Sequence, residues 1–539
     1  MSVNLDKLKT EAISESAKGM DTLPTLDLLK LMMVSQKDAV KAVKKNLPDI
    51  EKAVKAAAAK LEAEDGVLRY VGSGTSGRLG LQDGIELAPT FGWPLERVGV
   101  AMSGGKQAII KAMEGAEDDR DAAVKDLEEA GFSKHDVVIA LSASGRTPYV
   151  VSAAEHAGSH GALTIGISNN DGSPLQSASQ FAFYLDTSPE PIGGSTRMSA
   201  GTSQKIILNL ITSAIMFELG YVSRGQVEGL IKSTDGLRES KTYSWKPSTR
   251  NFLDMMLESQ EHAVNCLDEA LPSIAKAADA VAVSLNVPDA KLVCAGAGTT
   301  ARTGTQDFVE LQPTFGWPLE KVSYLIAGGE ESLTTPLKWV GLDADEGVAH
   351  VRDENLSTKD VFVLASISGY TTYTLAIEDY ARDTLKACTV AIANSEDSPL
   401  LKNAQYPILL SSSDKPTDTL TRLGSGTAQK VAFNLFSSAV MVRRGHVYDG
   451  YMVDVQLNNE KLVERALRMV EAITGCNRKE AERVLNLSGE GKHRNVKKAV
   501  LIHYGINTAD VEEYLNTHGG NLRRALRALK QEKKPILEL

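Results

Sequence analysis

Two short stretches rich in glycine and hydroxyl side chains are the first candidates for chemistry. GSGTSGRLG begins at Gly72 and should start a helix near Ser76, whereas SASGRTP begins at Ser142, after the β-branched run 136–142. Backbone N–H groups at a helix start bind anions, and neighbouring hydroxyls add donors. Each stretch alone is typical of an ordinary strand-to-helix turn, but two together favour a phosphorylated ligand in one crevice. The hydroxyl donors that we predict for this ligand are Ser76, Ser142, Ser144 and Thr147.

Carboxylates near these loops could act as acid and base. Glu86 lies in DGIELAPTFG, where we expect the helix that begins near Ser76 to stop before Pro89, and Glu114 lies in AMEGAEDD. Two carboxylates around one ligand can remove a proton next to a carbonyl and protonate a departing oxygen. Ten helical residues at ~1.5 Å each place Glu86 about 15 Å from the first loop, too far to reach a ligand there. For Glu114, a surface charge in an acidic helix is an equal alternative.

An internal repeat offers a second helix-end glutamate for the first pocket. GSGTSGRLGLQDGIELAPTFGWPLERV recurs from Gly296 as GAGTTARTGTQDFVELQPTFGWPLEKV, with about two thirds of the positions identical, so the chain is a tandem duplication with a period of about 225 residues. Such halves pack as a pseudo-symmetric pair. We therefore expect Glu310 to complete the first pocket and Glu86 the second, with a solvated helix-end carboxylate as the alternative. Lys338 aligns with Glu114, so the first pocket alone would hold two acids.

The elements that must position these residues alternate between strands and helices. Runs such as DVVIALS and ALTIGIS end in Gly, Ser or Asn loops and precede helical stretches, which predicts an α/β fold with parallel sheets covered on both faces. Each half opens with a helical hairpin, and the chain after about residue 461 is helical only. We predict three domains at 1–235, 236–460 and 461–539, in which the halves form an intramolecular pseudo-dimer that could act as a monomer.

Composition excludes several classes of function. The 539 residues carry a net charge of −10, which leaves no basic surface for nucleic acid apart from a short patch at 492–498. No apolar run is long enough to span a bilayer, and the first residues lack a secretory signal, so we expect a cytoplasmic protein. The four cysteines are scattered and neither loop is a nucleotide motif. We therefore predict no metal and no cofactor.

The motifs together resemble a known family. GSGTSGRLG, ELAPTFG, AMEGAED, SASGRTPYV and GSTRMSAGTSQK resemble N-acetylmuramic acid 6-phosphate etherase, and the similarity continues in YMVDVQLNNEKLVERA and NVKKAV. The tandem arrangement is similar to the glucokinase regulatory protein, which has two sugar-isomerase-type domains and a helical lid. The resemblance implies two tandem flavodoxin-like αβα sandwich (SIS) domains, the second degenerate, plus a small C-terminal all-helical domain. It also implies a sugar phosphate as the ligand.

The resemblance assigns roles to individual residues. It implies cleavage of the lactyl ether at carbon 3 by elimination and addition of water, giving N-acetylglucosamine 6-phosphate and D-lactate, a step of peptidoglycan recycling. Glu114 matches the residue that removes the proton at carbon 2, and Glu310 or Glu86 matches the one that protonates lactate. Ser195 and Thr196 match further sugar contacts, and Lys497 is the best match to a lid lysine that complements the phosphate.

The sequence also departs from the family pattern. Leu87 and Ala88 stand where the etherase usually has Cys-Pro, and Tyr370 replaces Arg146 in the second half. Two functions from different classes remain open. The chain is an etherase with one complete site, or a non-catalytic phosphosugar-binding regulator of a partner sugar kinase. A sugar phosphate isomerase is a weaker third alternative, because no additional histidine base is present in a matching loop.

Overall fold

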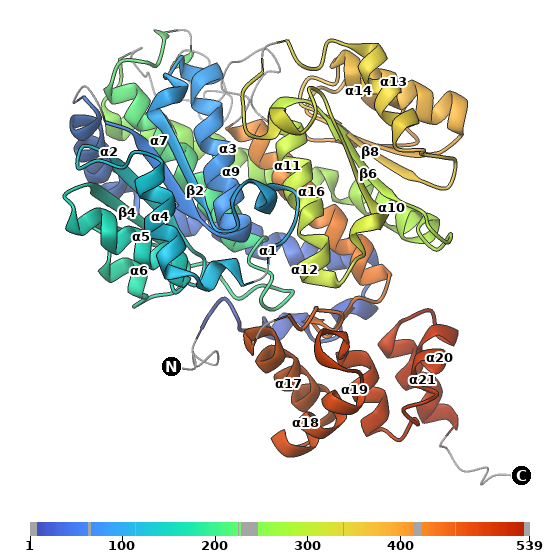
Figure 1. Cartoon of the computed structure of the whole chain (residues 1–539). Helices are drawn as coiled ribbons and strands as arrows, with labels where there is room; N and C mark the ends of the chain where they lie inside the picture. The colour runs from blue at the N-terminus through green and yellow to red at the C-terminus, as the bar shows by residue number, and fades with distance from the viewer. Residues whose placement is uncertain are drawn as a thin grey trace, which may run out of the picture.

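Each half of the chain builds a five-stranded parallel sheet with helices on both faces (Figure 1). The computed structural model describes residues 8–62, 66–113, 115–224, 226–227, 246–337, 339–412, 423–458 and 460–532. The first sheet has the order β2-β1-β3-β4-β5 and consists of β1 (Leu68–Gly72), β2 (Val98–Met102), β3 (Val137–Leu141), β4 (Leu163–Ser168) and β5 (Phe181–Tyr184). The second has the same order read from its other edge, β10-β9-β8-β6-β7, and consists of β6 (Leu292–Gly296), β7 (Val322–Ile326), β8 (Val361–Ser366), β9 (Cys388–Ala393) and β10 (Tyr406–Leu409).

The central strands are apolar throughout because both of their faces are buried. In β3, Val137 and Ile139 face a core that is shared with the other half, whereas Val138 and Ala140 face a separate cluster with α4 and α5. This alternation follows from the two-residue period of a strand. The α/β fold with two parallel sheets, predicted from the repeat, is confirmed.

The helices of the first half are α1 (Thr25–Lys44), α2 (Leu47–Leu61), α3 (Gly74–Phe91), α4 (Arg120–Glu129), α5 (Pro148–Ser159), α6 (Pro174–Ser177) and α7 (Ser199–Glu218). Those of the second half are α9 (Thr249–Asn265), α10 (Leu267–Ser284), α11 (Gly298–Val309), α12 (Leu311–Phe315), α13 (Ala344–Asp353), α14 (Thr372–Asp379), α15 (Pro399–Asn403) and α16 (Gly424–Arg443). The repeat extends to local signals. Asp119 caps α4 and Asp343 caps α13, each by accepting bonds from two backbone N–H groups of the first turn.

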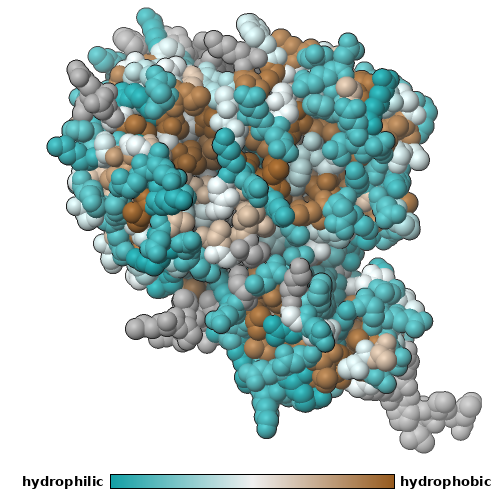
Figure 2. Space-filling model, in the orientation of Figure 1, coloured by the Kyte–Doolittle hydropathy of each residue, from teal (hydrophilic) through white to brown (hydrophobic). Residues whose placement is uncertain are grey.

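The two halves share one continuous apolar core. It contains residues of the hairpin α1–α2, the hairpin α9–α10, and the long buried helices α7 and α16. The hairpins contact both long helices, since α1 packs against α7, α9, α10 and α16. The expected pseudo-dimer is therefore built with an interior in common, and its halves are not two separate globules (Figure 1). On the face that Figure 2 shows, hydrophilic side chains predominate, and apolar ones gather in recesses over the first half and between the halves.

Helices alone form the third unit, which we call the lid. It consists of α17 (Glu460–Thr474), α18 (Arg478–Leu487), α19 (Val496–His503), α20 (Val511–Thr517) and α21 (Leu522–Glu532), and it follows the ribbon β11 (Val447–Tyr448) and β12 (Tyr451–Met452). The lid lies below the two sheets in Figure 1. The segment 8–23, here called the N-terminal arm, ties the lid to the first half. Within it, Glu11 pairs with Arg465 of α17 at 2.7 Å, and Asp21 pairs with Arg523 of α21 at 2.5 Å.

One local prediction was wrong. Pro89 does not stop α3, which continues to Phe91. A proline removes one N–H and strains the helix one turn earlier, but α3 tolerates it two residues from its end. The helix ends at Gly92, whose φ of 72° lies in the left-handed region and whose N–H bonds to Ala88 O. The domain boundaries stay a prediction, because the first falls in 228–245, outside the described residues.

Candidate functional site

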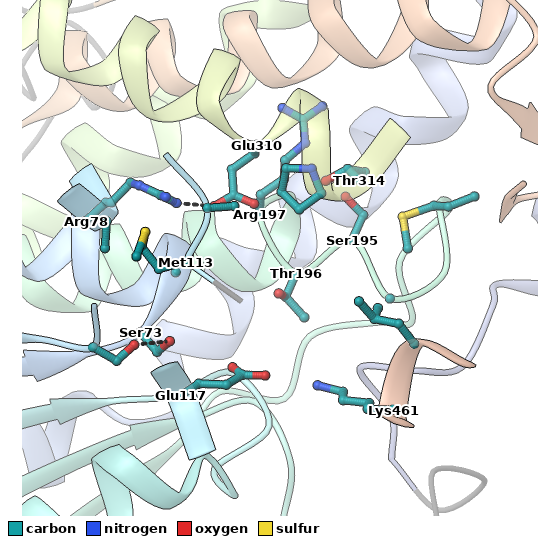
Figure 3. Close-up of a pocket in the computed structure, with 18 of the residues that line it drawn as sticks. Ser73, Arg78, Met113, Glu117, Ser195, Thr196, Arg197, Glu310, Thr314 and Lys461 are labelled. Carbon is teal, nitrogen blue, oxygen red and sulfur yellow. Dashed lines mark hydrogen bonds and ion pairs between the residues drawn. The ribbon is translucent and has the colours of Figure 1, made fainter. Parts of the chain in front are cut away.

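A cavity of about 200 Å³ lies where the first half, the second half and the lid meet (Figure 3). It is open to solvent and lined by polar and charged side chains from all three units. The first half contributes the start of α3, the end of β2 and the turn that follows it, and the loop before α7. Those lining residues are Ser73, Gly74, Arg78, Ser103, Ala108, Ala112, Met113, Gly115, Glu117, Gly194, Ser195, Thr196 and Arg197. The second half contributes Glu310, Pro313, Thr314 and Met452, and the lid contributes Lys461, Leu462 and Arg465.

The start of α3 forms one wall of this cavity because glycines let two backbone segments approach. A Cβ on Gly72 would lie 2.6 Å from the backbone of Gly77, so only glycine fits at the end of β1. Gly74 adopts a φ of 50° and allows the chain to turn into the helix. Ser73 accepts a bond from the Ser103 hydroxyl at 2.6 Å. The first N–H groups of α3 therefore stand at the cavity, in the arrangement that binds anions.

Glu310 reaches this cavity from the second half. It lies between α11 and α12, and its Oε1 accepts bonds from Thr75 Oγ1 at 2.8 Å and from Arg78 Nη1 at 2.5 Å. The Arg78 side chain is 2% exposed and also donates to backbone carbonyls of the turn after β2. The structure thus brings Glu310 to the first half's loop, where the helix-length argument expected it (Figure 3). Its chemical role stays a prediction.

Glu86 occupies the mirror position in the second half. Its Oε1 lies 3.6 Å from Nη1 of Arg302, the repeat counterpart of Arg78, and it accepts a bond from Gln82 at 3.2 Å. Glu86 is 3% exposed and is absent from the lining of the first-half cavity. The two helix-end glutamates are therefore exchanged between the halves, and Glu310 is the one placed beside α3.

Glu114 and Lys338, the second acid and its repeat counterpart, lie outside the described residues. Met113 and Gly115 line the cavity. Glu117 also lines it, and in Figure 3 its carboxylate faces Lys461 of the lid. After Gly115, the residues Ala116–Asp118 form a 3-10 turn, and α4 begins at Arg120.

The predicted hydroxyl donors divide into two groups. Ser195 and Thr196 line the cavity, and the buried Ser195 hydroxyl has no hydrogen-bond partner within the described residues. The other four are not among the lining residues. Ser76 donates to Gln204 at 2.7 Å, whereas Ser142 bonds to Thr147 at 2.9 Å and to Ser144 at 3.3 Å.

The loop that holds Ser142 nevertheless begins beside the cavity. Leu141, the last residue of β3, pairs with Gly72, the last residue of β1. The two hydroxyl-rich loops therefore leave adjacent strands at the same sheet edge, as the sequence predicted. Ser142 also accepts a bond from Gly145 N at 3.1 Å, which fixes the loop.

The lid presents different cations from the one we predicted. Lys497 is 4% exposed, donates to Gly520 O at 2.7 Å and pairs with Asp454, which lies between β12 and α17, and it does not line the cavity. Burial raises the pKa of the Asp454 carboxyl. The ammonium of Lys497 lowers this pKa, and the net result is a lowered pKa. Lys461 and Arg465 line the cavity in its place. Both belong to YMVDVQLNNEKLVERA, a segment that the family resemblance already included, and their spacing by one helical turn places them on one face of α17.

The N-terminal arm orients these lid cations. Arg465 donates to both carboxylate oxygens of Glu11, and Lys461 lies 3.9 Å from the same carboxylate. The Lys461 side chain is 41% exposed, so its ammonium keeps access to solvent and to a ligand. Across the described part of the chain, no group of three or more His, Cys, Asp or Glu side chains is arranged to hold a metal ion. The same residues contain no helix long and apolar enough to cross a membrane.

Comparison with solved structures and family models defines the class. A putative tagatose-6-phosphate ketose/aldose isomerase from Clostridium novyi NT superposes with a TM-score of 0.52 at 12% identity, covering 81% of this chain and 95% of its own. A family model of the glucokinase regulatory protein N-terminal SIS domain matches residues 49–157, and the SIS domain model matches residues 121–214. The fold is therefore that of the SIS proteins.

Curated relatives narrow the class to one family. The N-acetylmuramic acid 6-phosphate etherase of Deinococcus radiodurans is 46% identical over 215 residues, which cover 40% of this chain and 70% of the relative. The etherase of Geobacillus thermodenitrificans is 44% identical over 235 residues, which cover 44% of this chain and 79% of the relative. The chain belongs to the N-acetylmuramic acid 6-phosphate etherase family.

Proposed function

We propose that the chain is a carbon-oxygen lyase that converts N-acetylmuramic acid 6-phosphate to N-acetylglucosamine 6-phosphate and D-lactate. Family membership gives the reaction, and the observation that carries it to this molecule is Glu310 of the second half at the α3 cavity of the first. A tandem chain with one such cavity contains both contributors to a complete site. It can therefore act as a monomer, and the absence of a candidate membrane span among the described helices is compatible with the expected cytoplasmic location.

The two carboxylates share the elimination in this proposal. Glu114 removes the proton at carbon 2 of the ring-opened sugar, while a second carboxylate gives its proton to the ether oxygen as the carbon–oxygen bond at carbon 3 breaks. Water then adds across the double bond, with its hydroxyl at carbon 3 and a proton returned to carbon 2. Glu310 is the acid that the cavity favours. Both of its donors contact Oε1, and Oε2 is the oxygen that would carry the proton.

The anionic groups of the substrate have donors at both ends of the cavity. We propose that the phosphate lies near the start of α3 and the neighbouring hydroxyl loop, with Ser76, Ser142, Ser144 and Thr147 shaping that end. Ser195 and Thr196 would contact the sugar from the opposite wall. Lys461 and Arg465 supply the cations of the lid, a role that we first gave to Lys497. Cationic donors at fixed positions both bind the substrate and orient its reacting bond.

The direct test is release of D-lactate from N-acetylmuramic acid 6-phosphate by the purified full chain in water enriched in ¹⁸O. Elimination followed by hydration places the heavy oxygen in the sugar product at carbon 3 and leaves lactate unlabelled. The same reaction in D₂O places deuterium at carbon 2. Heavy oxygen in lactate would exclude this mechanism, because water would then have attacked the lactyl carbon.

The same assay separates an enzyme from a sensor. No release of lactate by a folded chain that is stabilised by N-acetylglucosamine 6-phosphate would reject the proposed reaction. That outcome would favour the phosphosugar-binding regulator, whose carboxylates hold the sugar hydroxyls without breaking the ether.

A further inference from the structure

The loop Gly194–Arg197, here called the cavity loop, is fixed from the second half of the chain. The loop precedes α7 and contributes Ser195 and Thr196 to the cavity wall. Its own hydrogen bonds are short-range, such as Ser195 N to Ile192 O at 3.0 Å and Thr196 N to Gly194 O at 3.1 Å. Such a loop needs contacts from other elements to hold its hydroxyls in one position.

Lys430 of α16 supplies the contacts to the backbone. Its ammonium donates to Arg197 O at 2.6 Å and to Met198 O at 2.9 Å, and to the Thr202 hydroxyl at 2.7 Å. A fourth acceptor, Asn434 Oδ1 at 2.5 Å, lies on the same helix as Lys430 and shares the three N–H donors of the ammonium. Lys430 is 6% exposed, so the contacts form away from water, where charge-assisted bonds are strong.

Asp307 of α11 supplies a matching contact to a side chain. Its Oδ1 pairs with Arg197 Nη1 at 2.6 Å, and both side chains are at most 3% exposed. Arg197 also donates to the hydroxyls of Ser437 and Ser438 on α16. Residues of the second half therefore hold both the backbone and the Arg197 side chain at the end of the cavity loop, although the loop belongs to the first half.

We propose that Lys430 of the second half is a positioning residue for the active cavity. Its ammonium holds the hydroxyls of the cavity loop, which belongs to the first half, in their binding position. The expected effect of Lys430 on KM rests on the proposed function. The expected effect on the order of the cavity loop does not depend on that function. It also explains why the second half keeps GTAQK where the first has GTSQK. Each motif lysine crosses the pseudo-twofold and serves the other half.

The chain contains its own control for this proposal. Lys205, the repeat counterpart of Lys430, donates to Thr427 of the second half at 3.1 Å and to Asn209 at 2.9 Å. It is equally buried, at 5% exposed, in the same interface. Substitution of either lysine by methionine keeps an unbranched side chain, one heavy atom shorter, and removes the charge. Both variants lose interface bonds, but only Lys430→Met releases the loop of the cavity.

Protonation of Lys430 provides a second signature. Burial and the nearby cations Arg197 and Lys205 lower its pKa to about 7, and the carboxylates of Asp307 and Glu190 oppose this effect. The carbonyl and amide oxygens around Lys430 can only accept bonds, so loss of a proton removes a donor that the loop needs. The KM of the parent should rise as the pH passes above 7. Lys205→Met should keep this rise but move it to higher pH, because it removes a cation that lowers the pKa of Lys430, whereas Lys430→Met should lack the rise.

Hydrogen exchange and kinetics together test the proposal. We expect amide exchange in residues 195–202 to accelerate at least about tenfold in Lys430→Met and to stay within about twofold of the parent in Lys205→Met. We also expect kcat/KM for lactate release to fall about tenfold or more in Lys430→Met, chiefly through KM, since small displacements of binding groups have large kinetic effects. Lys205→Met should stay within about threefold.

The kinetic measurement and the hydrogen-exchange measurement test different parts of the proposal and can fail independently. If the parent releases no lactate, the proposed reaction is wrong, and the exchange measurement still decides the role of Lys430. Equal exchange in the two variants would overturn the positioning role, as would parent-like KM in Lys430→Met. Equal kinetic losses that track the loss of thermal stability would show that both lysines serve the interface only.

Discussion

The two halves of this chain keep the same framework but contribute different residues to the cavity at the start of α3. Ser142 bonds to Thr147 at 2.9 Å in the first half, and Ser366 bonds to Thr371 at 2.8 Å in the second. The start of α3 and the start of α11 are held by equivalent bonds to a glutamine of the long helix, at 2.7 and 3.0 Å. Divergence has therefore spared the loops that shape the ligand end of each sheet.

The side chains that the second half retains near the interface point into the first half. Glu310 contacts Arg78, Asp307 contacts Arg197, and Lys430 contacts the cavity loop. The lid cations Lys461 and Arg465 line the same cavity. A duplicated half is thus constrained at the positions that complete its neighbour, whether or not it has a reaction of its own. This comparison predicts that equivalent substitutions in the two halves have unequal effects.

The largest inequality should appear at the exchanged glutamates. We expect Glu310→Gln to lower kcat for lactate release by about 10³-fold, because it removes the proton donor of the proposed mechanism. Glu86→Gln, the equivalent change in the other copy, should stay within about threefold, since Glu86 lies beside Arg302 of the second half. Initial rates of D-lactate formation with saturating substrate measure both.

Circular dichroism and thermal unfolding of both glutamine variants provide the control for folding. Comparable losses in the two variants would break the comparison, because they would mean that both pockets work or that each glutamate acts through the interface. A greater loss in Glu86→Gln would reverse the assignment and make Glu86 the acid.

The next effect separates two lysines of the lid. Lys461→Met should raise KM about tenfold with little change in stability, because its ammonium is partly exposed at the cavity and its ion pair with Glu11 is long, at 3.9 Å. Lys497→Met should do the opposite. It removes the buried ammonium that pairs with Asp454 and leaves this carboxylate, which is 16% exposed, with its bond to His446. The lost charge-assisted bond destabilises by about 2 kcal/mol, while KM measured well below the unfolding transition stays near that of the parent.

Thermal unfolding and substrate titration of these two variants decide between the sequence prediction and the structure. A large rise in KM in Lys497→Met alone would restore the original assignment of the lid lysine. Unchanged KM in Lys461→Met would mean that Arg465 carries the interaction of the lid with the substrate by itself.

Long regular features of the fold followed from the sequence. The repeat predicted that the parallel sheet occurs twice. The length of α3 predicted that Glu86 and Glu310 are exchanged between the halves, because a helix has a fixed rise per residue. The choice between Lys461 and Lys497 could not be made in this way. Both are basic residues on helices of the lid. What distinguishes them is that Lys497 forms an ion pair with Asp454 in the folded state, and Asp454 lies more than forty positions before it in the chain.

The buried cross-contacts were also beyond the sequence. Lys430 lies in an apolar helix whose pattern gives no direction for its ammonium, and its acceptors are backbone carbonyls, which every residue has. Pro89 was misread for a related reason. A proline on average marks the end of a helix. Close to the C-terminal end of a helix, however, it removes one of only a few remaining backbone hydrogen bonds, and packing then decides whether the helix continues.

A smaller difference should separate the hydroxyl loops. Ser142→Ala and Ser366→Ala remove the same internal bonds, to Gly145 N and Gly369 N at 3.1 and 3.0 Å. Their effects on thermal stability should therefore be similar. We expect KM to rise about fivefold in Ser142→Ala and to stay within about twofold in Ser366→Ala, because only the first loop adjoins the cavity with Glu310. Equal rises in KM would indicate a working second pocket.

The smallest kinetic effect is expected at a position where the halves differ inside their cores. Glu378 of α14 is fully buried, and neither carboxylate oxygen has a hydrogen-bond partner among the described residues, whereas the repeat places Ala154 at this position in the first half. Burial and Asp379 raise the pKa of Glu378 to about 8, although Arg382 opposes the shift. An acid that is protonated in the folded protein and ionised in the unfolded chain destabilises increasingly as pH rises.

The free energy of unfolding should therefore fall between pH 5 and pH 8, with at most about 4 kcal/mol due to this group. Glu378→Gln has the same size and cannot ionise, so its unfolding free energy should lose this part of the pH dependence while kcat and KM stay at parent values. Urea unfolding at the two pH values measures the difference. The same pH slope in parent and variant would mean that Glu378 ionises freely in the folded state, and a change in KM would mean that the second half's outer core communicates with the cavity after all.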